Sequence, residues 1–199
     1  MDKVGLLKSI AEMGYNVGFG AKKHFATYDI VEKVPGWIGF LSLAVGIFGL
    51  VFEQLSSKVP SATLTVAGVV AFYISFYRSA EYERAGKEMT VIFNELRDLY
   101  RSVQAGAEPS AALVELKDLE GRFYGVSISK QILFSDWYAH FKFFGQHQIG
   151  WIDQQLNFKL WRDKVPASAK LLMYFIAFVT ALGVAGTIIS KLNLLEFSA

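Results

Sequence analysis

The sequence predicts an all-α integral membrane protein with a transmembrane helical hairpin, a cytosolic helical region and a third, C-terminal transmembrane helix. Hydrophobic residues make up 53% of the chain, more than the roughly 45–50% of a typical soluble domain. Three stretches contain no charged side chain: residues 36–52, 61–77 and 171–190. The alternation of apolar and polar residues that marks strands persists nowhere over a useful length.

Residues 1–35 are expected to form N-terminal cytosolic or interfacial helices. Apolar residues recur at helical spacing over residues 2–18 and predict an amphipathic helix. They are Leu6, Ile10, Met13 and Val17. Three glycines, at positions 14, 18 and 20, then loosen the chain, and Pro35 suits a break or kink where the chain meets the membrane.

Residues 36–78 are expected to form the transmembrane hairpin. A helix rises about 1.5 Å per residue and the hydrocarbon core is about 30 Å thick. The 17-residue stretches 36–52 and 61–77 are therefore at the lower limit for spanning. Trp37 and Tyr77 stand at their edges, as aromatic residues do at membrane interfaces. A buried helical hairpin in a soluble protein is the alternative.

Residues 79–165 are expected to form a cytosolic helical region. The helical register is expected to continue without interruption from the second span into a charged helix with one apolar seam. The seam comprises Met89, Ile92, Leu96, Leu99 and Val103. Residues 105–110, AGAEPS, predict a turn, after which a second seam folds back as a helical hairpin or pairs between protomers. The second seam comprises Leu113, Leu116, Leu119 and Phe123.

The remaining regions are an aromatic stretch and a third span. Residues 134–161 mix aromatic side chains with lysines and histidines, which fits a helix in the headgroup layer and an ordinary helical core equally well. Residues 166–199 are expected to hold a C-terminal transmembrane helix and a short outside tail. The 20-residue stretch 171–190 is long enough to span by itself.

The positions of Lys and Arg predict the orientation of the chain. These residues lie before the first span, after the second and ahead of the third, whereas the loop at residues 53–60 carries only Lys58. By the positive-inside rule, the N-terminus and residues 79–165 face the cytoplasm and the C-terminus lies outside. We therefore expect a multi-pass protein with most of its soluble mass in the cytosol.

No motif in the sequence demands catalysis. The chain has no cysteine, which excludes disulfides, thiolate metal sites and cysteine nucleophiles. Neither a complete phosphate-binding loop nor a nucleophile elbow occurs. Asp136, His140 and His147 are spaced for one helical face, but their aromatic neighbours favour a packed helix over a metal site. We expect no enzyme activity, no cofactor and no metal.

Two of the predicted spans carry a stripe of small residues on one helical face. In the first span the stripe is Gly39, Ser42, Gly46, Gly49 and Glu53. In the third it is Thr180, Gly183, Thr187 and Ser190. Small residues let helices approach closely, and small polar residues can instead line water. The third-span stripe is the better pore candidate because it carries three hydroxyls.

Three features follow one another along the chain. They are a basic AKKH element at residues 21–24, the glycine-rich hairpin, and the sequence YRSAE at residues 77–81, which leads into a long charged helix. Over residues 10–165 this arrangement resembles the SLATT family, the SMODS and SLOG-associating two-transmembrane effector domains of bacterial conflict systems. The resemblance implies an antiphage membrane effector that assembles as a pore, often encoded beside a nucleotidyltransferase that makes a nucleotide signal. The third span departs from the family's two-span description and leaves open which helix lines a pore.

Sequence and resemblance together predict a gated channel in the bacterial inner (plasma) membrane. A nucleotide or oligonucleotide from a partner nucleotidyltransferase would shift the cytosolic helices, open the channel and depolarise the membrane, causing growth arrest or death. Three spans offer too little wall for a conduit, so a cyclic homo-oligomer is expected, with a tetramer favoured.

Phosphate groups of a nucleotide ligand favour Arg and Lys. Basic residues are therefore the candidates for ligand contact. They are Lys22, Lys23, His24, Arg78, Arg84 and Arg122. Anchoring at the lipid headgroups is the alternative role for each of these residues. The alternative for the whole protein is a membrane-anchored scaffold that conducts nothing and recruits a cytosolic partner through the hairpin at residues 79–123.

Overall fold

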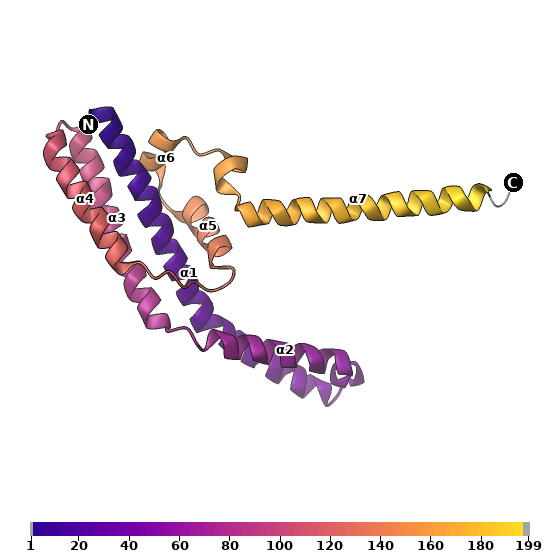
Figure 1. The fold of residues 1–199 in the computed structure, drawn as a ribbon. Coiled ribbons are helices and arrows are strands. Elements are labelled where there is room, and N and C mark those ends of the chain that lie inside the picture. Colours follow the sequence, from indigo (N-terminus) through magenta and orange to yellow (C-terminus); the bar gives the residue numbers. More distant parts are fainter. Residues whose placement is uncertain (1, 197–199) are drawn as a thin grey trace. The chain divides into compact units, whose positions relative to one another are not determined.

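The structure, a computed structural model, describes the backbone of residues 2–196 and the side chains of residues 2–186. It is 84% helical, with no strand in this described part, and the predicted all-α fold is confirmed (Figure 1). The chain divides into two compact units, Met1–Asn157 and Phe158–Ala199.

One helix, α1 (Lys3–Gly49), supplies both the helical bundle and the membrane hairpin of the first unit (Figure 1). The predicted amphipathic face is confirmed, because Leu6, Ile10 and Val17 are fully buried. The predicted loosening at the glycines and break at Pro35 are wrong, since α1 is continuous over 47 residues and contains Pro35. The predicted boundary between residues 35 and 36 therefore falls inside a helix.

Packing explains why the glycines do not interrupt α1. A Cβ at Gly14 would lie 2.3 Å from Cη2 of Trp151, and a Cβ at Gly18 would lie 2.8 Å from the Phe93 ring. Glycine is thus present because aromatic rings from other helices lie directly against α1. The helix is stabilised by these tertiary contacts, which outweigh the unfavourable helix propensity of glycine.

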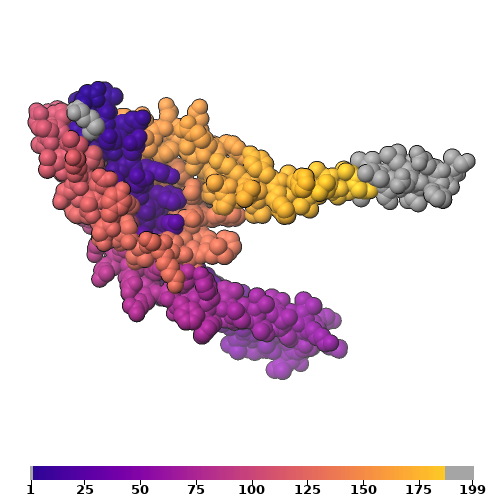
Figure 2. Space-filling view, in the orientation of Figure 1, coloured from indigo at the N-terminus to yellow at the C-terminus, as the bar shows by residue number. Residues whose placement is uncertain are grey.

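The end of α1, the short 3₁₀ helix η1 (Glu53–Ser56) and α2 (Lys58–Ile74) form the hairpin. Figure 2 shows the hairpin as a narrow projection from the bundle. Half-buried residues recur at steps of three and four and mark the facing sides of the two helices. They are Ile38, Ser42, Val45 and Gly49 on α1, and Leu64, Ala67 and Ala71 on α2. The other faces of both helices are largely apolar and exposed.

A bend of 58° separates α2 from α3 (Ser79–Gln104), so the predicted uninterrupted register is wrong. The hydroxyl of Ser75 donates to the carbonyl of Phe72 at 2.7 Å, at the end of α2. Tyr77 is buried in one cluster with Ile74, Tyr82 and Ile132. Burial of this aromatic ring between three segments holds the chain in its turn.

The predicted hairpin of α3 and α4 (Pro109–Val126) is present. All five residues of the first seam are buried, and they pack chiefly against α1, with α4 as a second neighbour. In the second seam Leu116 and Leu119 are buried, whereas Leu113 and Phe123 are half-buried. The α3 seam therefore has its partners within one protomer.

Helices α5 (Ser135–Gln146) and α6 (Gly150–Leu156) also pack on α1. Phe143 is fully buried, with its ring centre 5.5 Å from that of Tyr15. Phe134 and Phe141 of the same stretch are each 62% exposed. One part of the aromatic stretch thus belongs to the helical core and another part is exposed. Its composition had left open a helical core and a helix in the headgroup layer.

The second unit contains a π-helical turn, η2 (Leu160–Lys164), and α7 (Ala167–Glu196). Every side chain described over residues 171–186 is exposed. By length and composition two helices can cross a membrane alone, Lys3–Gly49 and Ala167–Gly186. Helix α2 counts as a third span only together with α3, across the 58° bend.

Candidate functional site

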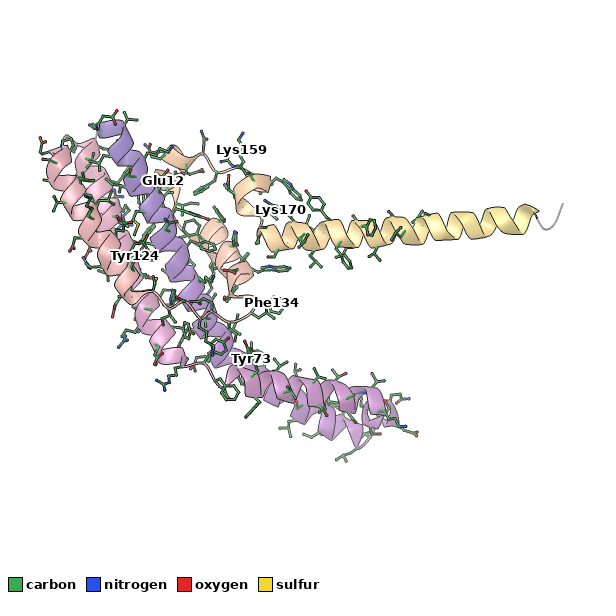
Figure 3. The ribbon with its side chains drawn as sticks, in the orientation of Figure 1. Glu12, Tyr73, Tyr124, Phe134, Lys159 and Lys170 are labelled. Atoms are coloured by element: carbon green, nitrogen blue, oxygen red, sulfur yellow. The ribbon has the colours of Figure 1, made fainter. Side chains whose placement is uncertain are left out.

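A buried polar junction connects the bundle to the membrane hairpin. It consists of His24 and Thr27 on α1, Tyr82 on α3, and Gln131 in the segment 127–134 between α4 and α5. Next to it lies the cluster of Ile74, Tyr77 and Ile132 at the end of α2. Figure 3 labels Tyr73 and Phe134, which lie in this part of the molecule.

His24 is buried and uses both of its ring nitrogens. Nδ1 lies 2.7 Å from the carbonyl of Gly20, and Nε2 accepts from the backbone N–H of Ile128 at 3.1 Å. Because a backbone N–H can only donate, Nε2 must be unprotonated, and Nδ1 carries the proton. Burial lowers the pKa of His24, which favours the neutral form that these two bonds require. His24 therefore holds the segment 127–134 against α1.

Gln131 and Tyr82 complete the junction. The hydroxyl of Thr27 donates to Oε1 of Gln131 at 2.6 Å, and Nε2 of Gln131 donates to the carbonyl of Ile128 at 2.7 Å. The phenol of Tyr82 donates to the carbonyl of Lys130 at 2.5 Å. Tyr82 stands in the first turn of α3, directly after the bend. The direction of α3 relative to α2 is therefore tied to the position of the segment 127–134.

Asp29 makes a second connection, between α1 and α5. Its carboxylate accepts from Lys142 of α5 and from Lys33, the latter at 2.6 Å. Burial opposes the negative charge, but the hydrogen bonds from the two lysines outweigh it and hold the pKa of Asp29 below its ordinary value. Helix α5 is thus fixed a short distance before the membrane segment of α1.

The six predicted ligand-contact residues do not converge on one site. Arg122 of α4 makes a two-pronged pair with Glu95 of α3, at 2.6 and 3.3 Å. Arg78 and Arg84 pair with glutamates one turn further along α3, at 3.1 and 4.0 Å. His24 belongs to the junction. The three arginines therefore pair with glutamates of α3, and none of these pairs involves either lysine of α1.

Lys22 and Lys23 lie beside α5. Lys23 pairs with Asp136 at 2.7 Å. No carboxylate among the described residues lies within ion-pair distance of Lys22, and burial, followed by nearby Lys142, lowers the pKa of Lys22. The adjoining cavity measures about 10 Å³, the space of about one water molecule. A nucleotide at Lys22 would have to bind on the surface.

The small-residue stripe of the first span is split between two environments. Nothing described lies within 4 Å of a Cβ at Gly39 or Gly46, whereas Ser42 and Gly49 are half-buried in the hairpin. Glu53 lies exposed at the start of η1. The face that contains Gly39 and Gly46 is thus left open by its own protomer.

The third-span stripe is described only in part. Thr180 is exposed, and its hydroxyl donates to the carbonyl of Ile176 at 2.8 Å. Gly183 has nothing described within 4 Å of a Cβ. The side chains of Thr187 and Ser190 lie outside the described residues. Because the hydroxyl of Thr180 donates its hydrogen bond within the helix, this side chain can face either lipid or water.

Sequence reasoning missed Thr27, Tyr82 and Gln131. Thr27 and Gln131 are 104 residues apart, and Tyr82 is 48 residues from Lys130, so no local pattern could pair them. A weak signal exists in Gln131, a polar residue between two isoleucines at 128 and 132. Among the described residues, no group of three His, Asp or Glu side chains is arranged to hold a metal ion.

The fold and the junction define a membrane protein in which a small helical bundle is connected through a buried polar contact to membrane helices. The chain belongs to the SLATT family: the family described as SMODS and SLOG-associating 2TM effector domain 6 matches residues 1–173. Membership makes it a two-transmembrane effector of antiphage conflict systems. The match covers the bundle and the hairpin and ends inside α7. No curated protein and no solved structure matches the chain.

Proposed function

We propose that this effector assembles as a cyclic homo-oligomer, a tetramer by preference, and conducts ions across the bacterial plasma membrane. The N-terminus and the bundle face the cytoplasm, and the C-terminus lies outside. A nucleotide or oligonucleotide made by a partner nucleotidyltransferase gates the channel. Opening depolarises the membrane and stops growth or kills the cell.

The observation that carries this proposal is the uncovered apolar surface of the membrane helices. In the first unit, Gly39 and Gly46 have nothing described within 4 Å of a Cβ, and the second unit by itself leaves Gly183 and the described side chains of residues 171–186 open. Small residues on an open face allow close approach of another helix. Neighbouring protomers of a ring would supply that helix, because each copy presents the same faces.

The junction supplies a route for gating. A ligand that binds the bundle shifts the equilibrium only if it binds one arrangement of the helices better than another. Among the candidate lysines and arginines, Lys22 is the one without a described carboxylate partner. Its positive charge would therefore gain more from an anionic ligand than the charges that are already paired. Movement of α3 would pull on the segment 127–134 through Tyr82, and movement of α5 would pull on α1, just before the hairpin, through the pair between Lys142 and Asp29.

Ion flux through vesicles that contain the purified chain tests the proposal, with and without nucleotides and short oligonucleotides. The Thr180→Leu, Thr187→Leu double variant fills the third-span stripe with apolar bulk and is expected to abolish flux. The matched control is Ala185→Leu, which adds similar bulk on the opposite face of α7 and is expected to conduct normally. Absence of flux from folded, inserted wild-type protein in every condition would refute conduction.

A scaffold that conducts nothing remains the second candidate, and a groove on the bundle favours it. The groove has a volume of about 400 Å³ and is lined by Glu88, Val91, Ile92, Arg122 and Val126. It lies on the α3 and α4 hairpin, the surface that the scaffold hypothesis uses. In that case phage protection would survive the double variant in α7 and be lost in Val91→Glu.

A further inference from the structure

Four apolar side chains form an exposed surface on and just before α5, here called the aromatic face: Leu133, Phe134, Trp137 and Phe141. Leu133 is 69% exposed, and the ring centres of Phe134 and Trp137 lie 6.1 Å apart. Positions 134, 137 and 141 share one side of a helix. The opposite side holds α5 in the bundle through Phe143, which is fully buried. Phe134 and Phe141, each 62% exposed, are therefore largely left out of the packing of the bundle, whereas Trp137, at 36%, lies partly within it.

Phe134 adopts a backbone conformation that large side chains rarely adopt. Its φ is 68°, in the left-handed region, which disfavours a residue with a Cβ by about 1–2 kcal/mol. Burial within the protomer does not offset this cost, because Phe134 is 62% exposed. Asn157, the other non-glycine residue with positive φ in the described chain, is a residue type that tolerates the conformation. The strain at Phe134 directs an apolar ring outward (Figure 3).

The aromatic face begins at the depth where the hairpin meets the bundle. Ile132, directly before Leu133, is buried in one cluster with Ile74, and Val34 packs against this cluster. Ile74 is the last residue of α2, and Val34 lies two residues before the membrane segment of α1 begins at Gly36. The pair between Lys142 and Asp29 fixes α5 to the same part of α1. The aromatic face thus follows directly on the residue that packs at the bundle end of the hairpin.

We propose that the aromatic face lies in the lipid headgroup layer and anchors the bundle to the bilayer. Aromatic side chains with an apolar body accumulate at this depth. On α1, Trp37 and Phe40 line an open pocket of about 440 Å³ together with Lys33, whose partner Asp29 also pairs with Lys142 of α5. Four lysines in this region, Lys23, Lys33, Lys130 and Lys142, outnumber its two paired carboxylates, Asp29 and Asp136, and the excess positive charge attracts anionic headgroups. Apolar rings rimmed by cations fit a lipid surface.

The absence of cysteine from the chain permits a direct depth measurement. Phe134→Cys and Phe141→Cys each place one nitroxide label on the aromatic face. Tyr124→Cys and Val114→Cys are matched controls on α4, where the native side chains are 64% and 71% exposed. Figure 3 shows Tyr124 on the α4 flank of the bundle and Phe134 on the α5 side. The full chain is reconstituted in vesicles of phosphatidylcholine and phosphatidylglycerol.

The expected result is a severalfold higher ratio of oxygen collisions to aqueous nickel-complex collisions at positions 134 and 141 than at 114 and 124. Equal ratios at all four positions would show that the face is in water and would overturn the proposal. Spin–spin broadening at position 141 that disappears on dilution with unlabelled chain would assign the face to a second copy instead. None of these measurements depends on ion conduction. The proposed membrane anchor can therefore be refuted without refuting the proposed channel, and the reverse also holds.

Discussion

Gly18 shows how one missing side chain fixes the contact between three helices. A Cβ at this position would lie 2.8 Å from the Phe93 ring and 2.9 Å from the Phe143 ring. Gly18→Ala is therefore expected to lower the free energy of unfolding by about 1–3 kcal/mol, as overpacking does. Gly121→Ala is the control, because nothing described lies within 4 Å of a Cβ there.

At Gly121 the better helix propensity of alanine acts alone and is expected to raise stability by about 0.5–1 kcal/mol. Denaturant unfolding followed by circular dichroism in detergent measures both changes. Shifts of the same sign in the two variants would contradict the packing role of Gly18.

His147 makes the stability of the bundle depend on pH. Burial, followed by the charges of Lys22 and Arg97, lowers the pKa of His147 from 6.5 to about 4. Between these values the unfolded chain binds more protons than the folded chain, so stability increases with pH. The contribution is complete above pH 6.5 and is lost as the pH falls toward 4.

His147→Gln is expected to lose less stability than the wild type on acidification from about pH 7 to pH 5, because it removes one group that must accept a proton. Thermal unfolding at the two pH values measures this difference. His24 has a lowered pKa as well, so the variant is expected to keep part of the pH dependence. Identical losses in wild type and variant would exclude His147 as a contributor.

At the scale of elements, Tyr82 is the side chain that joins α3 to the segment 127–134. Tyr82→Phe leaves the carbonyl of Lys130 without its 2.5 Å donor and is expected to destabilise the protein by about 1–2 kcal/mol. If the junction couples ligand to channel, the same variant also has a weaker flux response. Tyr124→Phe is the control, since that hydroxyl makes only an exposed 3.4 Å contact with Glu120. Indistinguishable behaviour of the two variants would remove Tyr82 from the coupling route.

The sequence predicted those elements whose signals are local. The buried faces of α1 and α3 follow helical periodicity, and the turn before Pro109 follows from its own residues. Continuity of α1 through Gly14 could not be predicted, because it depends on Trp151, far along the chain. The bend after α2 depends in the same way on Ile132. Of the candidate site, only His24 was selected in advance, and for a different role.

At the scale of the whole molecule, the open face of α1 predicts contact between protomers. Gly46→Cys provides one thiol per chain, and a disulfide forms only where two Cα atoms come within about 7 Å. Oxidation in the membrane is expected to give a covalent dimer from Gly46→Cys and little from Phe48→Cys, which lies on another face of the same helix. Gel electrophoresis without reductant measures the yield. Equal yields would place the contact elsewhere.

The unbroken length of α1 also has a mechanical consequence. A helix of 47 residues is about 70 Å long, and it reaches from the aromatic contacts of the bundle to the far tip of the hairpin. Gly49 lies about 46 Å along the axis from Gly18. For a stiff rod of this length, a tilt of about 10° at Gly18 displaces the tip by about 8 Å. A rigid α1 would therefore act as a lever arm, in which a small tilt within the bundle becomes a displacement of about 8 Å at the tip of the hairpin.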